Sequence, residues 1–544
     1  MMNISPMLLK QCADVLTDAV YSLFKLIADA AQWPAKWGQS RVIGVHKRNN
    51  RAEAKNYRPI AGLDNLSLCF ERVVDPQFDS WIFKFIPECQ FGFRKRCGTD
   101  DYGAAVSAEL SEALEKLWEV LLISLDVAGA FDKVWWKALL ANLEHCGMGG
   151  KALGILKSYL SNRKFKVVAN GVASALKSYD AGVPQGGIWS PKLWNFHIRE
   201  LVNVVVHCLL FKYADDSAMM KTIKDIKDRV GAVKEVDEDL QAVSDWGKKW
   251  KVEFEPTKTH ALLCTRKKPG MDQPTMDGKK IKFVSHLKLV GITIDSRLNW
   301  KKMACSAASK GRSMMGAMYK MQSLLKQSDM QKVYLSFIRS KMEFGSMEYI
   351  AAAPTHLAKL DRVQRAAEKL CGCTFQTLTD RREAAVFSLV CKLLDGECVE
   401  PLQKFAPEFE ADSVVKVKTR LQHKIESNKS EELKPKQNQH RNFSLNNYKW
   451  SWQGQAARIF NRIPADLKAK GTKGSWMKIK SVGKAIINGS AEMKKLAAPK
   501  KKRKKLHHKS QKAVSTGSAI LNNELNANLT DWVEYAIAWN TNKT

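Results

Sequence analysis

Residues 211–220 read Phe-Lys-Tyr-Ala-Asp-Asp-Ser-Ala-Met-Met, with two adjacent carboxylates between short apolar runs. These runs predict two strands joined by a tight turn, with the acids at its tip. Adjacent residues of a strand point to opposite faces, whereas a turn lets Asp215 and Asp216 approach one point. Like charges held that close are costly unless a cation neutralises them, and oxygen ligands without nearby His or Cys favour Mg²⁺ over zinc.

A third acid has a similar setting. Residues 120–125, Val-Leu-Leu-Ile-Ser-Leu, form an apolar run of strand length that ends on Asp126, and helical spacing follows at 132–140. An acid at the end of a buried strand, together with two acids on a hairpin, is the arrangement that two-metal nucleotidyl transfer needs. We therefore predict that Asp126, Asp215 and Asp216 are catalytic and hold two Mg²⁺ ions, with Mn²⁺ as an alternative.

Five motifs occur in an order that resembles reverse transcriptases. The hairpin, Leu-Asp-Val-Ala-Gly-Ala-Phe-Asp-Lys-Val at 125–134 and Gly-Val-Pro-Gln-Gly-Gly-Ile-Trp-Ser-Pro at 182–191 resemble the core motifs. Asn-Tyr-Arg-Pro-Ile at 56–60 and Gln-Phe-Gly-Phe-Arg at 90–94 resemble the finger motifs of the non-LTR (LINE-type) retrotransposon branch. The arrangement is most similar to jockey-type elements and runs from about residue 33 to 387.

This resemblance implies an α+β right-hand polymerase fold, with fingers, a palm that carries an antiparallel sheet, and a helical thumb. It also implies an RNA-directed DNA polymerase whose partners are an RNA template, a DNA primer and dNTPs. With the helical spacing at 1–32 and in the thumb, we predict six parts: an N-terminal helix (1–32), fingers and palm (33–298), thumb (299–400), polar linker (401–440), basic nucleic-acid-binding extension (441–512) and an unassigned tail (513–544).

The resemblance also assigns roles to single residues. Lys47 and Arg58 would hold the triphosphate, a task that suits cations on a finger hairpin. Phe131 would stack under the incoming sugar and exclude the 2′-hydroxyl, although ordinary aromatic packing is an alternative. Val127 and Gln185 would complete the nucleotide site, where Gln185 offers both a donor and an acceptor.

Further roles concern the template and the leaving group. Arg94 and Lys95 lie in a basic finger segment that would contact template phosphates without reading bases. Lys258 resembles the lysine that protonates pyrophosphate, with several lysines nearby as rivals. Residues 287–295 resemble the primer-grip hairpin.

Two residues depart from the family pattern. Gly187 stands where Ser or Thr is common, and Trp189 stands where Leu is common. A larger ring beside the nucleotide pocket would put full activity in doubt. These departures, and the lack of an endonuclease-like segment before Trp33, support an alternative in which the chain is an inactive retroelement remnant that binds RNA or DNA. A group II intron maturase is a weaker alternative, because the thumb segment is jockey-like.

The charge balance indicates a polyanionic partner. Lys and Arg exceed Asp and Glu by 88 − 55 = +33, and residues 441–512 contribute 20 − 2 = +18 of this. Aromatic residues within that segment (Trp450, Trp452, Phe460 and Trp476) suggest stacking on nucleic acid. The run Pro-Lys-Lys-Lys-Arg-Lys-Lys at 499–505 is typical of a nuclear localisation signal, read by an import receptor, with a nucleic-acid tail as the rival. We therefore predict location in the nucleus, and also in the cytoplasm.

Other classes are disfavoured. The longest apolar segment, near 201–211, is too short to cross a bilayer, so we predict no membrane partner. Twelve cysteines in 544 residues are too dilute for a disulfide framework. Cys371 and Cys373 are not joined by the spaced Cys or His residues that would complete a zinc site.

Overall fold

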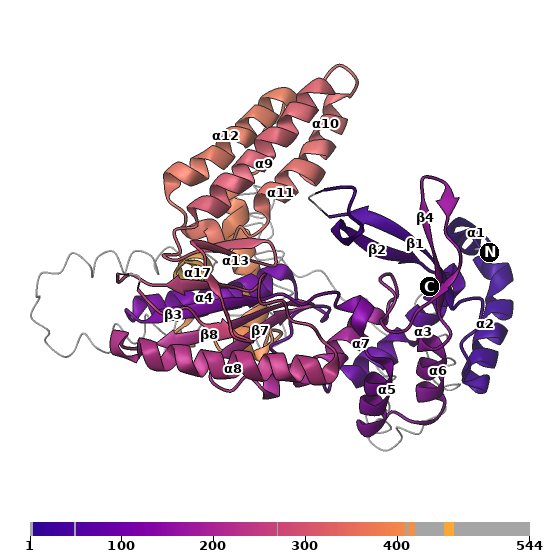
Figure 1. Ribbon diagram of the computed structural model, residues 1–544. Coiled ribbons are helices and arrows are strands. Elements are labelled where there is room, and N and C mark those ends of the chain that lie inside the picture. Colours follow the sequence, from indigo (N-terminus) through magenta and orange to yellow (C-terminus); the bar gives the residue numbers. More distant parts are fainter. Residues whose placement is uncertain are drawn as a thin grey trace, which may run out of the picture.

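The computed structural model describes residues 4–47, 50–268, 270–406, 408–410, 413–418 and 451–461. Figure 1 shows a sheet-containing central part, a second sheet with helices at one side, and a group of long helices that stands above them. These correspond in position to the palm, the fingers and the thumb. None of the helices within the described ranges combines the length and the apolar character needed to cross a membrane.

The palm is a five-stranded sheet covered by helices on both faces. Its central strand is buried on both sides, so its side chains alternate between two clusters: Val120 and Leu122 pack on the side of α4, and Leu121 and Ile123 on the side of α8. The spatial order is β12 (Lys282–Phe283), β9 (His260–Cys264), β3 (Glu119–Leu125), β8 (Asp216–Ile223), β7 (Leu209–Tyr213), with helices α4 (Thr99–Glu115) and α8 (Arg229–Trp250).

Strand β3 pairs antiparallel with both β8 and β9, and β7 pairs antiparallel with β8. This is the predicted antiparallel palm sheet, with one short parallel addition where β12 joins β9. Two hairpins and two short helices complete the region: β10 (Thr275–Met276) with β11 (Lys279–Lys280), β13 (His286–Leu289) with β14 (Ile292–Asp295), η3 (Arg199–Asn203) and η4 (Ile226–Asp228).

The fingers contain a second sheet and a cluster of aromatic side chains. In the sheet, β1 pairs antiparallel with β2 and parallel with β4. The elements are β1 (Gln39–His46), η1 (Ala54–Asn56), β2 (Tyr57–Gly62), α3 (Asn65–Ile82), η2 (Phe131–Lys133), α5 (Trp136–His145), α6 (Gly150–Leu160), β4 (Lys164–Ala169), β5 (Val172–Ala173), β6 (Lys177–Ser178) and α7 (Ser190–His197).

The thumb is helical, as its apolar spacing predicts. Helices α9 and α12 pack along each other, and a π-helical segment, η5, continues α10. The elements are α9 (Lys301–Lys320), α10 (Gln327–Val333), η5 (Tyr334–Arg339), α11 (Ser340–Glu343), η6 (Glu348–Ala351), α12 (Pro354–Cys371), α13 (Leu378–Leu394) and α14 (Glu400–Gln403).

The structure differs from the predicted elements at both ends. The single helix expected over 1–32 is two helices, α1 (Pro6–Gln11) and α2 (Ala13–Ala30), because Cys12 leaves helical geometry between them. The second ends at Ala31 in a left-handed cap, before Pro34. The expected linker at 401–440 contains the paired strands β15 (Glu408–Glu410) and β16 (Ser413–Lys418).

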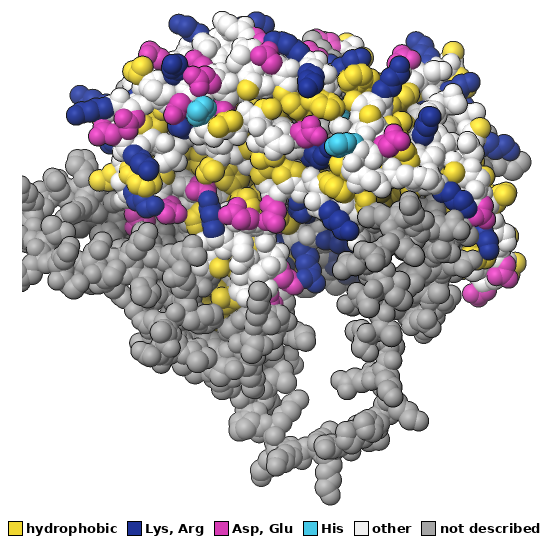
Figure 2. Space-filling model, turned by 90° about the horizontal axis from the view of Figure 1, so that it is seen from below, with side chains coloured by type: hydrophobic (Ala, Val, Ile, Leu, Met, Phe, Trp, Pro, Cys, Tyr) yellow, Lys and Arg dark blue, Asp and Glu magenta, His cyan; other side chains and the backbone are white. Residues whose placement is uncertain are grey.

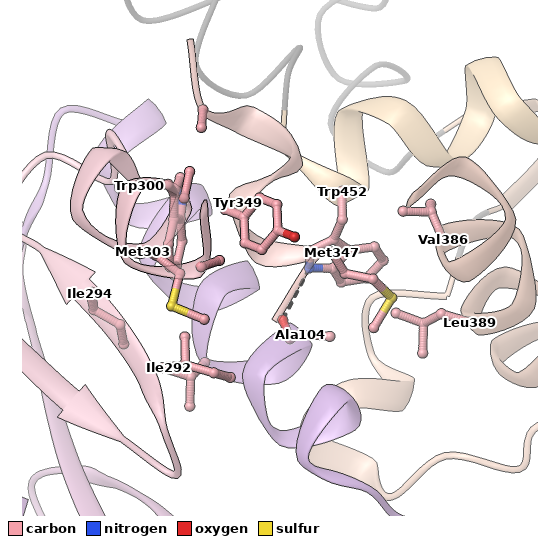
Figure 3. Close-up of a cluster of buried hydrophobic side chains, with 14 of the residues drawn as sticks. Ala104, Ile292, Ile294, Trp300, Met303, Met347, Tyr349, Val386, Leu389 and Trp452 are labelled. Carbon is pink, nitrogen blue, oxygen red and sulfur yellow. Dashed lines mark hydrogen bonds between the residues drawn. The ribbon is translucent and has the colours of Figure 1, made fainter. Parts of the chain in front are cut away.

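The interpretation of Trp452 and Phe460 as nucleic-acid stacking residues is wrong. Both lie on α17 (Trp452–Asn461) and are 2% and 0% exposed. The Trp452 indole N–H donates to the Ala104 carbonyl at 3.2 Å (Figure 3). Phe460 packs on Phe387 of α13. The segment therefore completes the core between palm and thumb. Trp450, Trp476 and the basic run at 499–505 lie outside the described residues.

On one face of the molecule, the basic side chains are mixed with acidic ones (Figure 2). Figure 2 shows a face on which, among the described residues, basic and acidic side chains are interspersed with apolar ones. This face therefore offers no continuous cationic surface among those residues.

Candidate active site

The β7–β8 hairpin ends in a two-residue turn. Tyr213 pairs with Asp216, which leaves Ala214 and Asp215 at the tip. Ala214 has a φ of 60°, in the left-handed region that most residues avoid. Asp215 and Asp216 therefore sit at the end of the sheet, as the sequence predicts.

Asp126 reaches the same end of the sheet from the neighbouring strand. The register pairs Leu125 with Ser217, so the next residue along β3 lies beside the hairpin tip. Asp126 stays half exposed, with 45% of its side chain accessible. The structure thus brings together three acids that lie far apart along the chain.

The pKa of Asp216 records how close these acids are. Desolvation by the surrounding protein, and then the Asp215 and Asp126 carboxylates, raise it to about 6, although the side chain still reaches solvent. A hydrogen bond from the Val290 N–H and the charge of Lys288 act in the opposite direction. No sequence pattern indicates that the β13–β14 hairpin would supply these two neighbours, because their position depends on how the hairpin packs.

The donor set at this point fits a hard divalent cation. It consists of carboxylate oxygens whose mutual repulsion a shared cation would relieve. Within the described ranges, no group of three or more His, Cys, Asp and Glu side chains has the arrangement needed to hold a metal ion.

Lys258 lies beside one of the three acids, Asp126. Its Nζ is 3.6 Å from Asp126 Oδ2, and its side chain is 62% exposed. The backbone explains this position, because the Glu255 N–H donates to the Asp126 carbonyl at 3.0 Å. The rival Lys248 pairs with Asp277, and Lys251 lies over the Trp135 ring.

Two of the predicted nucleotide-binding residues lie near Asp132, which follows the Asp126 strand. Gln185 Nε2 donates to Asp132 Oδ1 at 3.1 Å, and Lys47 is close enough to lower the pKa of Asp132, against the larger effect of burial, which raises it. Arg58 is exposed on β2, in the strand pair that carries Lys47 at its end. Val127 bridges to Phe254 on the segment that leads to Lys258.

Phe131 is half-buried between two aromatic rings. It stacks on Trp194, with centroids 6.2 Å apart, and meets Phe93 edge-on at 6.3 Å. These contacts show that aromatic packing holds the ring in place. The proposed contact with an incoming sugar would use its remaining exposed surface.

Trp189 lies in the finger core, so the expectation of a larger ring beside the nucleotide pocket is wrong. Its side chain is 3% exposed and packs against Trp33, Phe78 and Tyr159 in the finger core. Its indole N–H donates to the Glu71 carbonyl at 3.1 Å. The ring is therefore enclosed by the finger core.

Gly187 has a related explanation. A Cβ at this position would lie 2.7 Å from both Ser190 Oγ and Tyr159 Oη, and 3.3 Å from Glu71 Oε2. The same Glu71 oxygen accepts the N–H groups of Ile188 and Trp189. The two departures are thus parts of one locally consistent packing arrangement around a buried glutamate.

The two predicted template residues are engaged within the protein. The Arg94 guanidinium donates to the carbonyls of Ile86, Pro87 and Gln90, the last two at 3.1 and 2.9 Å. Lys95 pairs with Asp79 at 3.1 Å but is 77% exposed. Arg94 therefore braces its own loop, and template contact by either residue remains a prediction.

Comparison with known proteins agrees with this geometry. Residues 45–294 match the family model described as reverse transcriptase (RNA-dependent DNA polymerase). The RNA-directed DNA polymerase from mobile element jockey of Drosophila melanogaster is 26% identical over 355 residues, which cover 63% of this chain and 38% of that protein. The probable RNA-directed DNA polymerase from transposon BS of the same organism is 27% identical over 290 residues, covering 51% of this chain and 32% of that protein.

Among solved structures, telomerase from Candida tropicalis in complex with a TWJ fragment of telomeric RNA matches with 12% identity and a TM-score of 0.36, covering 86% of this chain and 68% of that chain.

The chain spans 38% of the length of the jockey polymerases that it matches. The family match confirms the predicted α+β right-hand polymerase fold. Residues 45–294 therefore form a reverse transcriptase domain, similar to those of jockey-type non-LTR retrotransposons.

Proposed function

We propose that this chain is an RNA-directed DNA polymerase that copies an RNA template into DNA by extending a DNA primer with dNTPs. The observation that supports this most strongly is the convergence of Asp126, Asp215 and Asp216 at one end of the palm sheet. The carboxylates repel one another there, and a bound cation would relieve that repulsion, so we favour a cation-binding role over a purely structural one.

Asp126, Asp215 and Asp216 would hold two Mg²⁺ ions, which Mn²⁺ could replace. When bound, such ions lower the pKa of the primer 3′-hydroxyl and neutralise charge on the triphosphate. Lys258, whose amine lies beside Asp126, would deliver a proton to the departing pyrophosphate.

The finger residues would position the nucleotide. Lys47 and Arg58 would supply positive charge for the triphosphate, and Gln185 and Val127 would complete the nucleotide site. The Phe131 ring would contact the sugar where a 2′-hydroxyl would otherwise fit, which favours dNTPs over ribonucleotides. Arg94 and Lys95 would face the template backbone.

Primer extension on an RNA template tests the proposal. Wild-type protein with Mg²⁺ and dNTPs should extend the primer, and Asp215→Asn, which keeps the side-chain shape, should abolish extension. Asp329→Asn is the matched control, because this half-exposed thumb acid forms a local ion pair with Lys332. Equal extension by the Asp215 variant, or none by wild type, would refute the proposal.

The alternative of an inactive remnant that binds RNA or DNA loses one of its grounds, because Trp189 packs in the finger core and Gly187 fits around Glu71. It would be selected if wild type bound RNA in a salt-dependent manner without incorporating dNTPs.

The run at 499–505 supports a nuclear location through an import receptor. A fluorescent fusion with this run replaced by alanines tests that part separately.

A further inference from the structure

The turn that carries Asp215 requires an unusual backbone conformation. Its first residue, Ala214, has a φ of 60°, which glycine adopts easily and alanine does not. Hairpin turns with a positive φ at this position usually have glycine there. Something outside the hairpin must therefore stabilise the conformation.

The side chain of Gln90 provides this stabilisation. It is fully buried, its Oε1 accepts the Ala214 N–H at 2.9 Å, and its Nε2 donates to the Ala214 carbonyl at 3.2 Å. The amide thus binds both backbone polar groups of Ala214. The Trp194 indole N–H donates to the same carbonyl at 3.3 Å.

The backbone around Gln90 fixes the amide against the turn. The Phe91 N–H donates to the Lys212 carbonyl, and the Lys212 N–H donates to the Cys89 carbonyl, both at 2.8 Å. A Cβ on Gly92 would lie 2.3 Å from the Ala214 nitrogen, so glycine permits this close approach. Arg94 in turn donates to the Gln90 carbonyl.

We infer that Gln90 is a positioning residue for Asp215: by holding Ala214 in the left-handed conformation, it sets the direction in which the Asp215 carboxylate leaves the turn. The inference rests on the proposed function. It assigns to the 90–94 segment a role in the catalytic hairpin, separate from contact with a template.

Loss of the amide should affect chemistry more than nucleotide binding. Without Gln90, Ala214 is free to return to a negative φ, which displaces Asp215 while leaving Lys47, Arg58 and Gln185 in place. A displacement of about 1 Å in a reacting group costs roughly 10²-fold in rate. Glycine at position 214 would accept the positive φ without help and should offset part of this loss.

The experiment compares Gln90→Met, Ala214→Gly and the double variant in the full chain. We expect Gln90→Met to lower kcat for single-dNTP incorporation by roughly 10²-fold, with KM for dNTP little changed, and to weaken Mn²⁺ binding measured by electron paramagnetic resonance. Adding Ala214→Gly should recover about tenfold in kcat and restore part of the Mn²⁺ affinity. A purely structural role for Gln90 would not predict this rescue.

Gln364→Met is the matched control. This thumb glutamine is also buried, and its amide bonds Tyr334 and the Gln376 carbonyl, both at 3.0 Å. It should lower the melting temperature comparably and leave kcat and Mn²⁺ binding unchanged. Incorporation and Mn²⁺ affinity of Gln90→Met within twofold of wild type, or a loss that Ala214→Gly does not relieve, would overturn the inference.

Two further outcomes keep the tests separate. If wild type incorporates no dNTP, the proposed function fails, and Mn²⁺ binding alone decides the role of Gln90. If Gln90→Met does not fold, Trp194→Phe removes the other bond to the Ala214 carbonyl. Trp33→Phe is its control, because the buried Trp33 indole nitrogen has no hydrogen-bond partner within the described part of the chain. Trp194→Phe should lower kcat several-fold, and an unchanged kcat would overturn the inference.

Discussion

Replacing Trp189 by leucine, the residue common in the family, should destabilise this protein without impairing its nucleotide site. The indole is almost fully buried, and its ring lies 5.5 to 5.8 Å from those of Trp33, Phe78 and Tyr159. It also donates a hydrogen bond to the Glu71 carbonyl.

The magnitude follows from these contacts. Truncating a buried Trp to Ala costs about 3–5 kcal/mol, and Leu keeps roughly half of the side chain, so the packing loss is about 2 kcal/mol. The lost hydrogen bond to a buried carbonyl adds about 1 kcal/mol. We expect the free energy of unfolding to fall by about 3 kcal/mol in total.

Urea denaturation followed by tryptophan fluorescence and circular dichroism measures this change. Trp118→Leu serves as the control, because that ring is half-buried and should cost less. The folded Trp189→Leu protein should keep the KM for dNTP of wild type. A stability change below about 1 kcal/mol together with an altered KM would show that the ring lines the nucleotide pocket after all.

Three other predictions concern the acids, the lysine and the core. Because the pKa of Asp216 is raised to about 6, its proton competes with the divalent ion, so Mn²⁺ affinity should be full above that pH and fall as the pH drops through it; a flat titration between pH 5 and 7 would contradict this. Lys258→Met should lower kcat about 10²-fold in steady-state extension, whereas Lys248→Met should not. Trp452→Ala should lower the free energy of unfolding by about 3–5 kcal/mol in urea denaturation, with the salt dependence of RNA binding unchanged; a changed salt slope with unchanged stability would favour a surface role.

The sequence predicts those features of the site that depend on local pattern. An apolar strand that ends on Asp126 and an acidic hairpin tip define the sheet end, and strand pairing then forces the acids together. The helical thumb follows from apolar spacing in the same way. These features require no knowledge of which distant side chains pack together.

The remaining features depend on the direction in which side chains point. A motif gives the position of Trp189 along the chain but not the direction in which its side chain points. In the structure its indole N–H donates to the Glu71 carbonyl in the finger core. Trp452 sits in a cationic segment, yet its partner is the Ala104 carbonyl, 348 residues away. The role of Gln90 was hidden for the same reason, because a buried amide has no periodic signature.

The packing of α17 against α4 and α13 also bears on how the polypeptide can be shortened. Cleavage after α14 would separate Trp452, Ile459 and Phe460, which are at most 2% exposed, from the apolar surface they cover. That freshly uncovered surface would promote self-association in water. A shortened form of the protein, made by limited proteolysis or by expression, should therefore stay monomeric in solution only when it is cut after Asn461.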